Sequence, residues 1–237
     1  NKIEKKINIS CQIKVKDPLK FLTKSSELYR KNIKAKIIAI TGSCGKTTLK
    51  ELLGNSLNQL SKVGISPESY NNKYGVPLSL FNLDQKNNYG VLEIGMDKKG
   101  EIDNLSKIVK PDVSVITNIN YAHAKNFKNL KQIALAKSEI INNTKINGFI
   151  ILNADDNFYT LHKNIANKRK LKILSFGIDN QNANIKLTSI KKIANKFKAT
   201  VRINNLKTYF FISNNFQNNI LNILAALAVI SVFLNIT

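Results

Sequence analysis

The chain has 237 residues, of which 43% are hydrophobic and 22% are charged. This composition predicts a globular protein with one large core or two small ones, and it excludes an intrinsically disordered chain. The formal net charge is +22, but only 3 of the 37 basic residues are arginine, so 34 are lysine, and they occur throughout the chain. Arginine is the usual reader of bases, so we attribute the charge to compositional bias and expect no nucleic-acid partner.

The sequence also bears on membranes and redox environment. The longest apolar run, Ile220 to Leu234, is interrupted by Asn222 and is shorter than the ~20 residues of a membrane span. We expect a buried helix there. Two cysteines, Cys11 and Cys44, form no disulfide framework, which fits a reducing cytoplasm. Because the chain lacks an initial Met and stops just after an apolar helix, we expect a piece of a longer protein.

In chain order, the first expected element is an amphipathic helix over 17–33, with Asp17 as its N-cap and Pro18 in its first turn. Strand and helix patterns then alternate. Expected strands lie at 37–41, 90–94, 113–118, 149–153 and 171–176, and expected helices at 47–60, 101–110, 130–142 and 157–167.

Several of these strands are apolar on both faces, as in a parallel sheet covered by helices. The pattern therefore predicts an α/β fold with a mostly parallel, doubly wound sheet. Strand patterns at 182–190, 197–203 and 207–212 predict a small antiparallel β addition, and a last helix is expected over 218–233.

The stretch IIAITGSCGKTTLKELL, Ile37 to Leu53, has the features of a phosphate-binding loop. The general P-loop pattern places four residues between its glycines. Here only Ser43 and Cys44 separate Gly42 from Gly45. The glycines would allow the backbone to approach phosphates closely. We interpret Cys44 as a spacer that contributes its backbone.

The setting of the loop is that of a phosphate site, because a strand ends at Thr41 and Lys46, Thr47 and Thr48 open a helix. Backbone N–H groups and a helix N-terminus attract a polyphosphate. Lys46 would reach the terminal phosphates, and the Thr47 hydroxyl would ligate Mg²⁺. The alternative is a glycine turn closed by a threonine.

Other polar residues lie where the expected strands end. Glu93 closes one strand and is a candidate Mg²⁺ partner, or else a solvated carboxylate. His123 follows the next strand and could touch a metal, or be a satisfied loop histidine. His162 is expected on a helix surface. Asn71 and Asn72 suit the recognition of a polar substrate, and equally suit turn formation.

Taken together, these stretches resemble the Mur ligase family of ATP-dependent amide-forming enzymes in peptidoglycan synthesis, whose loop has the G-x-x-G-K-T spacing. The resemblance runs in order from about Lys36 through TGSCGKTTLKELL, SYNNKYGVPLSL, VLEIGMDKKGEIDNLSKIVKPDVSVITNINYAHAKNF, ALAKSEI, ILNADD and NNILNILAALAV. Within the family, Y-N-N-x-x-G-V-P and E-x-G-M-x-x-x-G-E-I resemble the members that add D-alanyl-D-alanine to UDP-N-acetylmuramoyl-tripeptide.

The resemblance implies that ATP phosphorylates the terminal carboxylate of the substrate, and that the amine of D-alanyl-D-alanine attacks the acyl phosphate. It assigns the β- and γ-phosphates to Lys46 and the backbone of Gly42–Thr48. It assigns one Mg²⁺ to Thr47 and Glu93, and a second metal to His123.

The resemblance also implies that Lys137, in ALAKSEI, is the family's carbamylated lysine and a metal ligand. It places Asn219 and Asn222 near adenine. Lys46, Glu93, His123 and Lys137 are thus the expected catalytic group, and Asn71 and Asn72 remain expected contacts of the substrate.

The same resemblance divides the chain. Residues 1–34 would be the tail of an N-terminal domain that binds the UDP substrate, 35–237 the central ATP-binding domain, and the C-terminal ligase domain would be missing. The fragment alone would be inactive. Expected partners are UDP-muramoyl tripeptide and D-alanyl-D-alanine, without a membrane span, and we expect a monomer.

Two alternatives remain. One is a Mur-type amide ligase with a different acceptor or amine. The other is a basic module that uses the loop as a nucleotide switch, which predicts steeply salt-dependent binding of nucleic acid.

Overall fold

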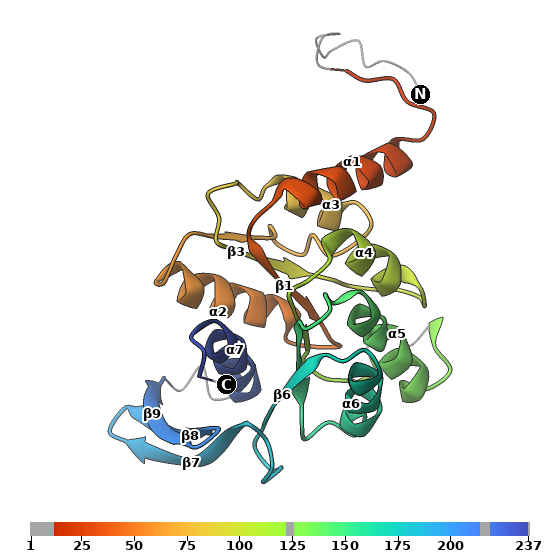
Figure 1. The fold of residues 1–237 in the computed structure, drawn as a ribbon. Helices are drawn as coiled ribbons and strands as arrows, with labels where there is room; N and C mark the ends of the chain where they lie inside the picture. The colour runs from red at the N-terminus through yellow and green to blue at the C-terminus, as the bar shows by residue number, and fades with distance from the viewer. Residues whose placement is uncertain (1–11, 122–125, 214–218, 237) are drawn as a thin grey trace.

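The fold, described by a computed structural model over residues 12–121, 126–213 and 219–236, is one nine-stranded sheet with helices on both faces (Figure 1). The strand order is β2-β3-β1-β4-β5-β6-β7-β8-β9. The strands are β1 Lys36–Thr41, β2 Val63–Ile65, β3 Tyr89–Glu93, β4 Val113–Ile116, β5 Phe149–Asn153, β6 Lys172–Gly177, β7 Ile185–Ile193, β8 Lys196–Ile203 and β9 Leu206–Ile212. The helices are α1 Pro18–Asn32, α2 Lys46–Asn58, α3 Gly75–Phe81, α4 Glu101–Val109, α5 Leu130–Asn143, α6 Tyr159–Lys168 and α7 Ile220–Phe233.

The predicted α/β class and parallel sheet are confirmed. Along the sheet from β2 to β7 every pairing is parallel, and β8 and β9 continue the sheet in antiparallel pairing. The antiparallel addition is therefore not a separate sheet, because β7 pairs directly with β6 through Phe176 and Gly177. Sequence analysis missed β2, which has only three residues, too few for an alternating pattern to be recognised.

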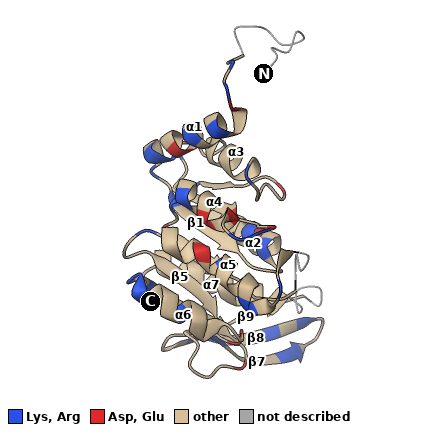
Figure 2. Ribbon diagram, turned by 90° about the vertical axis from the view of Figure 1, so that its right-hand side faces the viewer, with Lys and Arg blue, Asp and Glu red and all other residues tan. Residues whose placement is uncertain are grey.

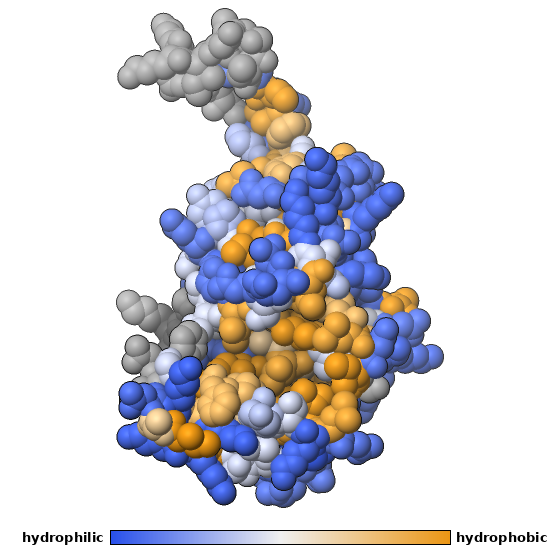
Figure 3. Space-filling model, turned by 90° about the vertical axis from the view of Figure 1, so that its left-hand side faces the viewer, coloured by the Kyte–Doolittle hydropathy of each residue, from blue (hydrophilic) through white to orange (hydrophobic). Residues whose placement is uncertain are grey.

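Two hydrophobic clusters lie on opposite faces of the sheet. Alternation along β1 explains why: Ile37 and Ala39 belong to the cluster covered by α1, α3, α4, α5 and α6, while Ile38 and Ile40 belong to the cluster under α2 and α7. Hydrophobic residues also gather across the middle of the face on the left of Figure 1, where α2 and α7 lie (Figure 3). None of the helices in the described part of the chain has the length and apolarity to cross a membrane.

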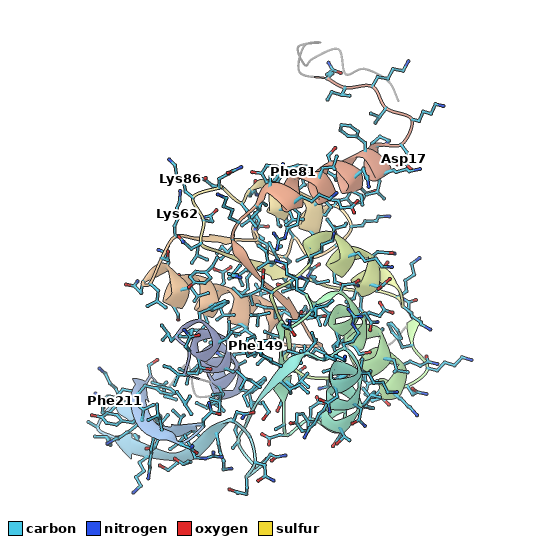
Figure 4. The ribbon with its side chains drawn as sticks, viewed as in Figure 1. Asp17, Lys62, Phe81, Lys86, Phe149 and Phe211 are labelled. Carbon is cyan, nitrogen blue, oxygen red and sulfur yellow. The ribbon has the colours of Figure 1, made fainter. Side chains whose placement is uncertain are left out.

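Helix α1 is joined firmly to the rest of the fold. Its N-cap Asp17 accepts a hydrogen bond from the backbone N–H of Lys20, as predicted, and marks the outer end of the helix (Figure 4). Near its other end, the buried guanidinium of Arg30 donates to the carbonyls of Val109 (2.7 Å), Lys110 and Ile33. It also lies 3.5 Å from an Asp112 carboxylate oxygen. Arg30 therefore ties α1 to the end of α4 and to the start of β4.

The expectation that His162 lies at the surface is wrong. Its side chain is 2% exposed, and its Nε2 lies 3.1 Å from the carbonyl oxygen of Ala134 on α5. Burial lowers its pKa. A single polar residue in the middle of a helix does not reveal which face it occupies, and here α6 turns that face toward α5.

Basic residues are spread over α1, α2, α6 and the outer strands (Figure 2). They form no single stripe in that view. This distribution agrees with the compositional interpretation of the net charge.

We predict that Arg30→Met lowers the free energy of unfolding by about 2–4 kcal/mol, because three carbonyls lose the guanidinium donor and the Asp112 carboxylate loses one of its cationic partners. Urea denaturation measures the loss. The matched control is Lys24→Met on the same helix, where the exposed pair with Glu27 should contribute at most about 0.5 kcal/mol. Equal effects of both variants would contradict the anchoring role of Arg30.

Candidate phosphate and metal site

The loop between β1 and α2 is shaped by its two glycines. Gly42 and Gly45 have φ values of 148° and 81°, conformations that favour glycine. A Cβ on Gly42 would lie 1.8 Å from Thr117 Oγ1, and one on Gly45 would lie 2.6 Å from Asn222 Oδ1. The short spacing therefore makes a tightly packed turn, with no room for side chains at either glycine.

Residues after β4 hold this loop in place. Thr117 Oγ1 donates to the carbonyl of Cys44 (2.6 Å), and Asn118 Oδ1 accepts the Cys44 N–H (3.0 Å). The N–H of Ser43 donates to the Asn118 carbonyl (2.9 Å). Sequence analysis did not select Thr117 or Asn118. The available signal was their place at the carboxyl end of a strand next to β1.

Two lysines meet at the Gly42 carbonyl. Lys46 Nζ lies 3.0 Å from that oxygen, and Lys137 Nζ, from α5, lies 2.9 Å from it. The Lys137 side chain is 2% exposed. Burial, together with the neighbouring Lys46 ammonium, lowers the pKa of Lys137 to about 7. The structure thus brings Lys137 to the loop, a residue that the family resemblance had named and that composition and periodicity do not select.

Glu93 joins the first turn of α2 to the segment that carries Asn71. Its carboxylate, 1% exposed, accepts a hydrogen bond from Thr47 Oγ1 (2.7 Å) and one from Asn71 Nδ2 (2.7 Å). A threonine hydroxyl and a carboxylate are oxygen ligands of the kind Mg²⁺ prefers. They adjoin the loop whose glycines leave no side chain in the way, so these residues fit a metal-bound polyphosphate. Among the described residues, no group of three or more His, Cys, Asp or Glu could hold a metal.

The paired asparagines differ in their contacts. Asn71 binds Glu93, whereas Asn72 Oδ1 accepts the N–H groups of Tyr74 and Gly75, the turn-forming role left open by the sequence. Both line a groove of about 1080 Å³. The groove runs between α1, the loop after β3 and α4, with Leu19, Met96 and Asn104 among its walls.

The other residues predicted to bind the nucleotide or a metal lie at several places around the loop or outside the described residues. Asn219 stands at the start of α7, and Asn222 lies against Gly45. Cys44 is an exposed free thiol, and Thr48 is exposed on the first turn of α2. His123 lies outside the described residues, so its assignment stays a prediction.

A strand, a glycine turn with Lys46 and Thr47, and a following helix define this chain as an α/β protein of the P-loop type. The Mur ligase middle domain matches residues 40–230, most of the chain. The chain therefore belongs to the Mur ligase family.

Curated relatives carry a more specific name. The chain is 39% identical over 176 residues to the UDP-N-acetylmuramoyl-tripeptide--D-alanyl-D-alanine ligase of Buchnera aphidicola subsp. Acyrthosiphon pisum, covering 73% of this chain and 36% of that protein. It is 34% identical over 229 residues to the enzyme of the same name from Buchnera aphidicola subsp. Baizongia pistaciae, covering 97% of this chain and 49% of that one. The chain thus spans less than half the length of these two relatives.

Among solved structures, the MurF ligase of Thermotoga maritima in complex with ADP matches with a TM-score of 0.84 at 29% identity. The match covers 97% of this chain and 53% of that chain. The fold and the family predicted from the sequence are both confirmed by these comparisons.

We predict that Gly42→Ala destabilises the protein by about 3 kcal/mol or more, because the new Cβ would displace Thr117 and open the loop. The control is Gly100→Ala, where φ is also positive, at +89°, but no atom lies within 4 Å of the new Cβ. Backbone strain alone should cost about 1–2 kcal/mol there. Urea denaturation compares the two; a smaller loss for Gly42→Ala would contradict the packing argument.

Proposed function

We propose that this chain is the ATP-binding part of a ligase that joins D-alanyl-D-alanine to UDP-N-acetylmuramoyl-tripeptide in peptidoglycan precursor synthesis. The observation that supports this most directly is a cluster of four side chains around the glycine loop at one end of the sheet: Lys46, Thr47, Glu93 and Lys137. The names of the relatives support the particular substrates. In this reaction ATP transfers its γ-phosphoryl group to the carboxylate of the tripeptide. The amine of D-alanyl-D-alanine then attacks the carbonyl carbon, and phosphate leaves.

The residues of the loop would bind the nucleotide. The N–H groups at the start of α2 and the ammonium of Lys46 oppose the negative charge of the β- and γ-phosphates. Asn222, packed on Gly45, and Asn219 are placed for contacts with the adenosine part. Phosphoryl transfer of this kind depends on positioning and on charge neutralisation, which fixed donors supply.

Thr47 and Glu93 would hold one Mg²⁺, and His123 would serve a second metal. When bound, the metal neutralises phosphate charge. Asn71 keeps the Glu93 carboxylate oriented through its amide hydrogen bond. The groove lined by Asn71 and Asn72 would take the peptide end of the acceptor, and Asn71 is linked through Glu93 to Thr47 of the loop.

We also propose that Lys137 is carbamylated. A pKa of about 7 leaves much of the amine neutral at neutral pH. The neutral nitrogen attacks the carbon of CO₂ and releases one proton, giving a carbamate anion. This change replaces the repulsion between Lys137 and Lys46 by attraction, and it adds a metal-ligating oxygen beside the loop.

Several wider assignments belong to the same proposal. Residues 1–34 would connect to a domain that binds the UDP substrate, and a further ligase domain would complete the enzyme. It would act in the cytoplasm as a monomer on small-molecule substrates. A different acceptor or amine within the family is the rival assignment.

The direct test is amide formation by the full-length gene product with ATP, UDP-N-acetylmuramoyl-tripeptide and D-alanyl-D-alanine, followed by ADP release and product mass. We expect Lys46→Ala to lower kcat by about 10²-fold or more, because the terminal phosphates lose their cation. The control is Lys168→Ala on the exposed end of α6, which should leave kcat unchanged. Near-normal turnover by Lys46→Ala would reject the loop as the phosphate site. Turnover only with other acceptors or amines would select the rival assignment.

Carbamylation has its own test. Isotope-labelled bicarbonate should introduce one carbamate signal by NMR, which Lys137→Met abolishes. Because the folded-state pKa lies near 7, protonation should reduce incorporation as the pH falls below 7. A label that is absent at pH 8, or that persists in Lys137→Met, would contradict the proposal.

A further inference from the structure

A second buried lysine lies one helical turn after the phosphate loop. Lys50, on α2, has a fully buried side chain. Its Nζ donates to the carbonyls of Ser66 (2.8 Å) and Glu68 (2.5 Å), and lies 3.0 Å from a carboxylate oxygen of Glu51. Two of the three ammonium donors thus hydrogen-bond to backbone carbonyls, and the Glu51 carboxylate adds an ion pair.

The segment that Lys50 binds leads to the site. It follows β2, and the N–H of Ser66 donates to the Val91 carbonyl on β3 (2.9 Å). The Ser66 hydroxyl accepts the N–H of Glu93 (3.3 Å). Five residues after Ser66, Asn71 donates to the Glu93 carboxylate, and its carbonyl accepts the Gly95 N–H. Lys50 is therefore connected to both ends of the Glu93–Asn71 contact.

The backbone conformation of Glu68 is an unfavourable one, which the hydrogen bond from Lys50 can stabilise. Its φ is 37°, in the left-handed region that a residue with a Cβ enters at a cost. The bond from Lys50 to the Glu68 carbonyl favours that conformation. The bend it stabilises turns the chain from β2 toward Asn71, Asn72 and the groove.

From these contacts we infer that Lys50 is a positioning residue for the ligation reaction. It couples the helix that begins at the phosphate loop to the segment that carries Asn71 and Asn72, and so keeps the acceptor groove aligned with the phosphate loop. This inference rests on the proposed function for its kinetic consequences, whereas its structural part stands on the hydrogen bonds alone.

Stability alone does not account for an ammonium at this position. Removing the Lys50 ammonium from water is costly, and an apolar side chain of similar volume often fills such a site without loss of stability. The hydrogen bonds of Lys50 instead fix the position of the segment that follows β2. Lys186 offers a matched comparison, because it is also a buried lysine that donates to a loop carbonyl, that of Ile178 (2.9 Å), on a strand that makes no contact with the groove.

The test compares Lys50→Met with Lys186→Met in the full-length gene product. We expect Lys50→Met to raise the KM for UDP-N-acetylmuramoyl-tripeptide about tenfold while the KM for ATP changes less than about twofold, because the glycine loop and Lys46 are left in place. Lys186→Met should change neither constant. Equal rises in both KM values for Lys50→Met, or the same profile for Lys186→Met, would overturn the inference.

Hydrogen exchange gives a readout that does not need activity. The backbone amides of residues 66–72 should exchange about tenfold faster or more in Lys50→Met and unchanged in Lys186→Met. Unchanged exchange in Lys50→Met overturns the inference, whether or not the wild-type protein ligates. Absence of wild-type ligation, with faster exchange in Lys50→Met, instead rejects only the proposed function.

A milder variant covers the case in which Lys50→Met fails to fold. Ser66→Ala keeps Lys50 and removes only the hydroxyl that accepts the Glu93 N–H. It should raise the KM for the tripeptide substrate in the same direction by a smaller factor, with the KM for ATP unchanged. A Ser66→Ala enzyme with wild-type constants and wild-type exchange over residues 66–72 would overturn the coupling.

Discussion

The register of β1 with its two parallel neighbours is the constraint on which the site depends. Ile40 pairs with Glu93 on β3, and Thr41 pairs with Ile116 on β4. The three strands therefore end at one level, and the residues that follow them must meet. Gly42 begins the loop there, Thr117 packs on it, and Glu93 faces the first turn of α2. A slip of one residue would turn Glu93 to the other face of the sheet and would break the contact with Thr47.

Much of this arrangement can be predicted from the sequence, because long apolar strands and a strand–glycine–lysine–helix stretch have strong local signals. The ends of β3 and β4 are recognisable in the same way, which made Glu93 a candidate. What sequence alone could not give are contacts set by tertiary packing. The residue pattern does not select Lys137 from 34 lysines; the family resemblance named it, and α5 places it on the Gly42 carbonyl. His162 gives no sign of the face it occupies.

Three buried lysines show how the same side chain acquires different properties from its surroundings. Lys50 donates to two carbonyls and pairs with the Glu51 carboxylate, and Lys186 donates to loop carbonyls. Lys137 donates to the same Gly42 carbonyl as Lys46, and burial together with repulsion from the Lys46 ammonium lowers its pKa. Lys50 and Lys186 make hydrogen bonds that link separate segments of the chain. At Lys137, burial and the Lys46 ammonium make the amine easier to deprotonate.

Within the described residues, the sheet ends in two edge strands of unequal length. At one end β2 spans three residues, and at the other β9 spans seven. An edge strand exposes unpaired N–H and C=O groups to which another chain can add. On β9 the exposed Tyr209 and Phe211 would favour such addition, whereas Lys207 and the lysines of β8 oppose it by charge repulsion between copies. Charge repulsion between these lysines would therefore oppose edge-to-edge pairing of two copies, independently of catalysis.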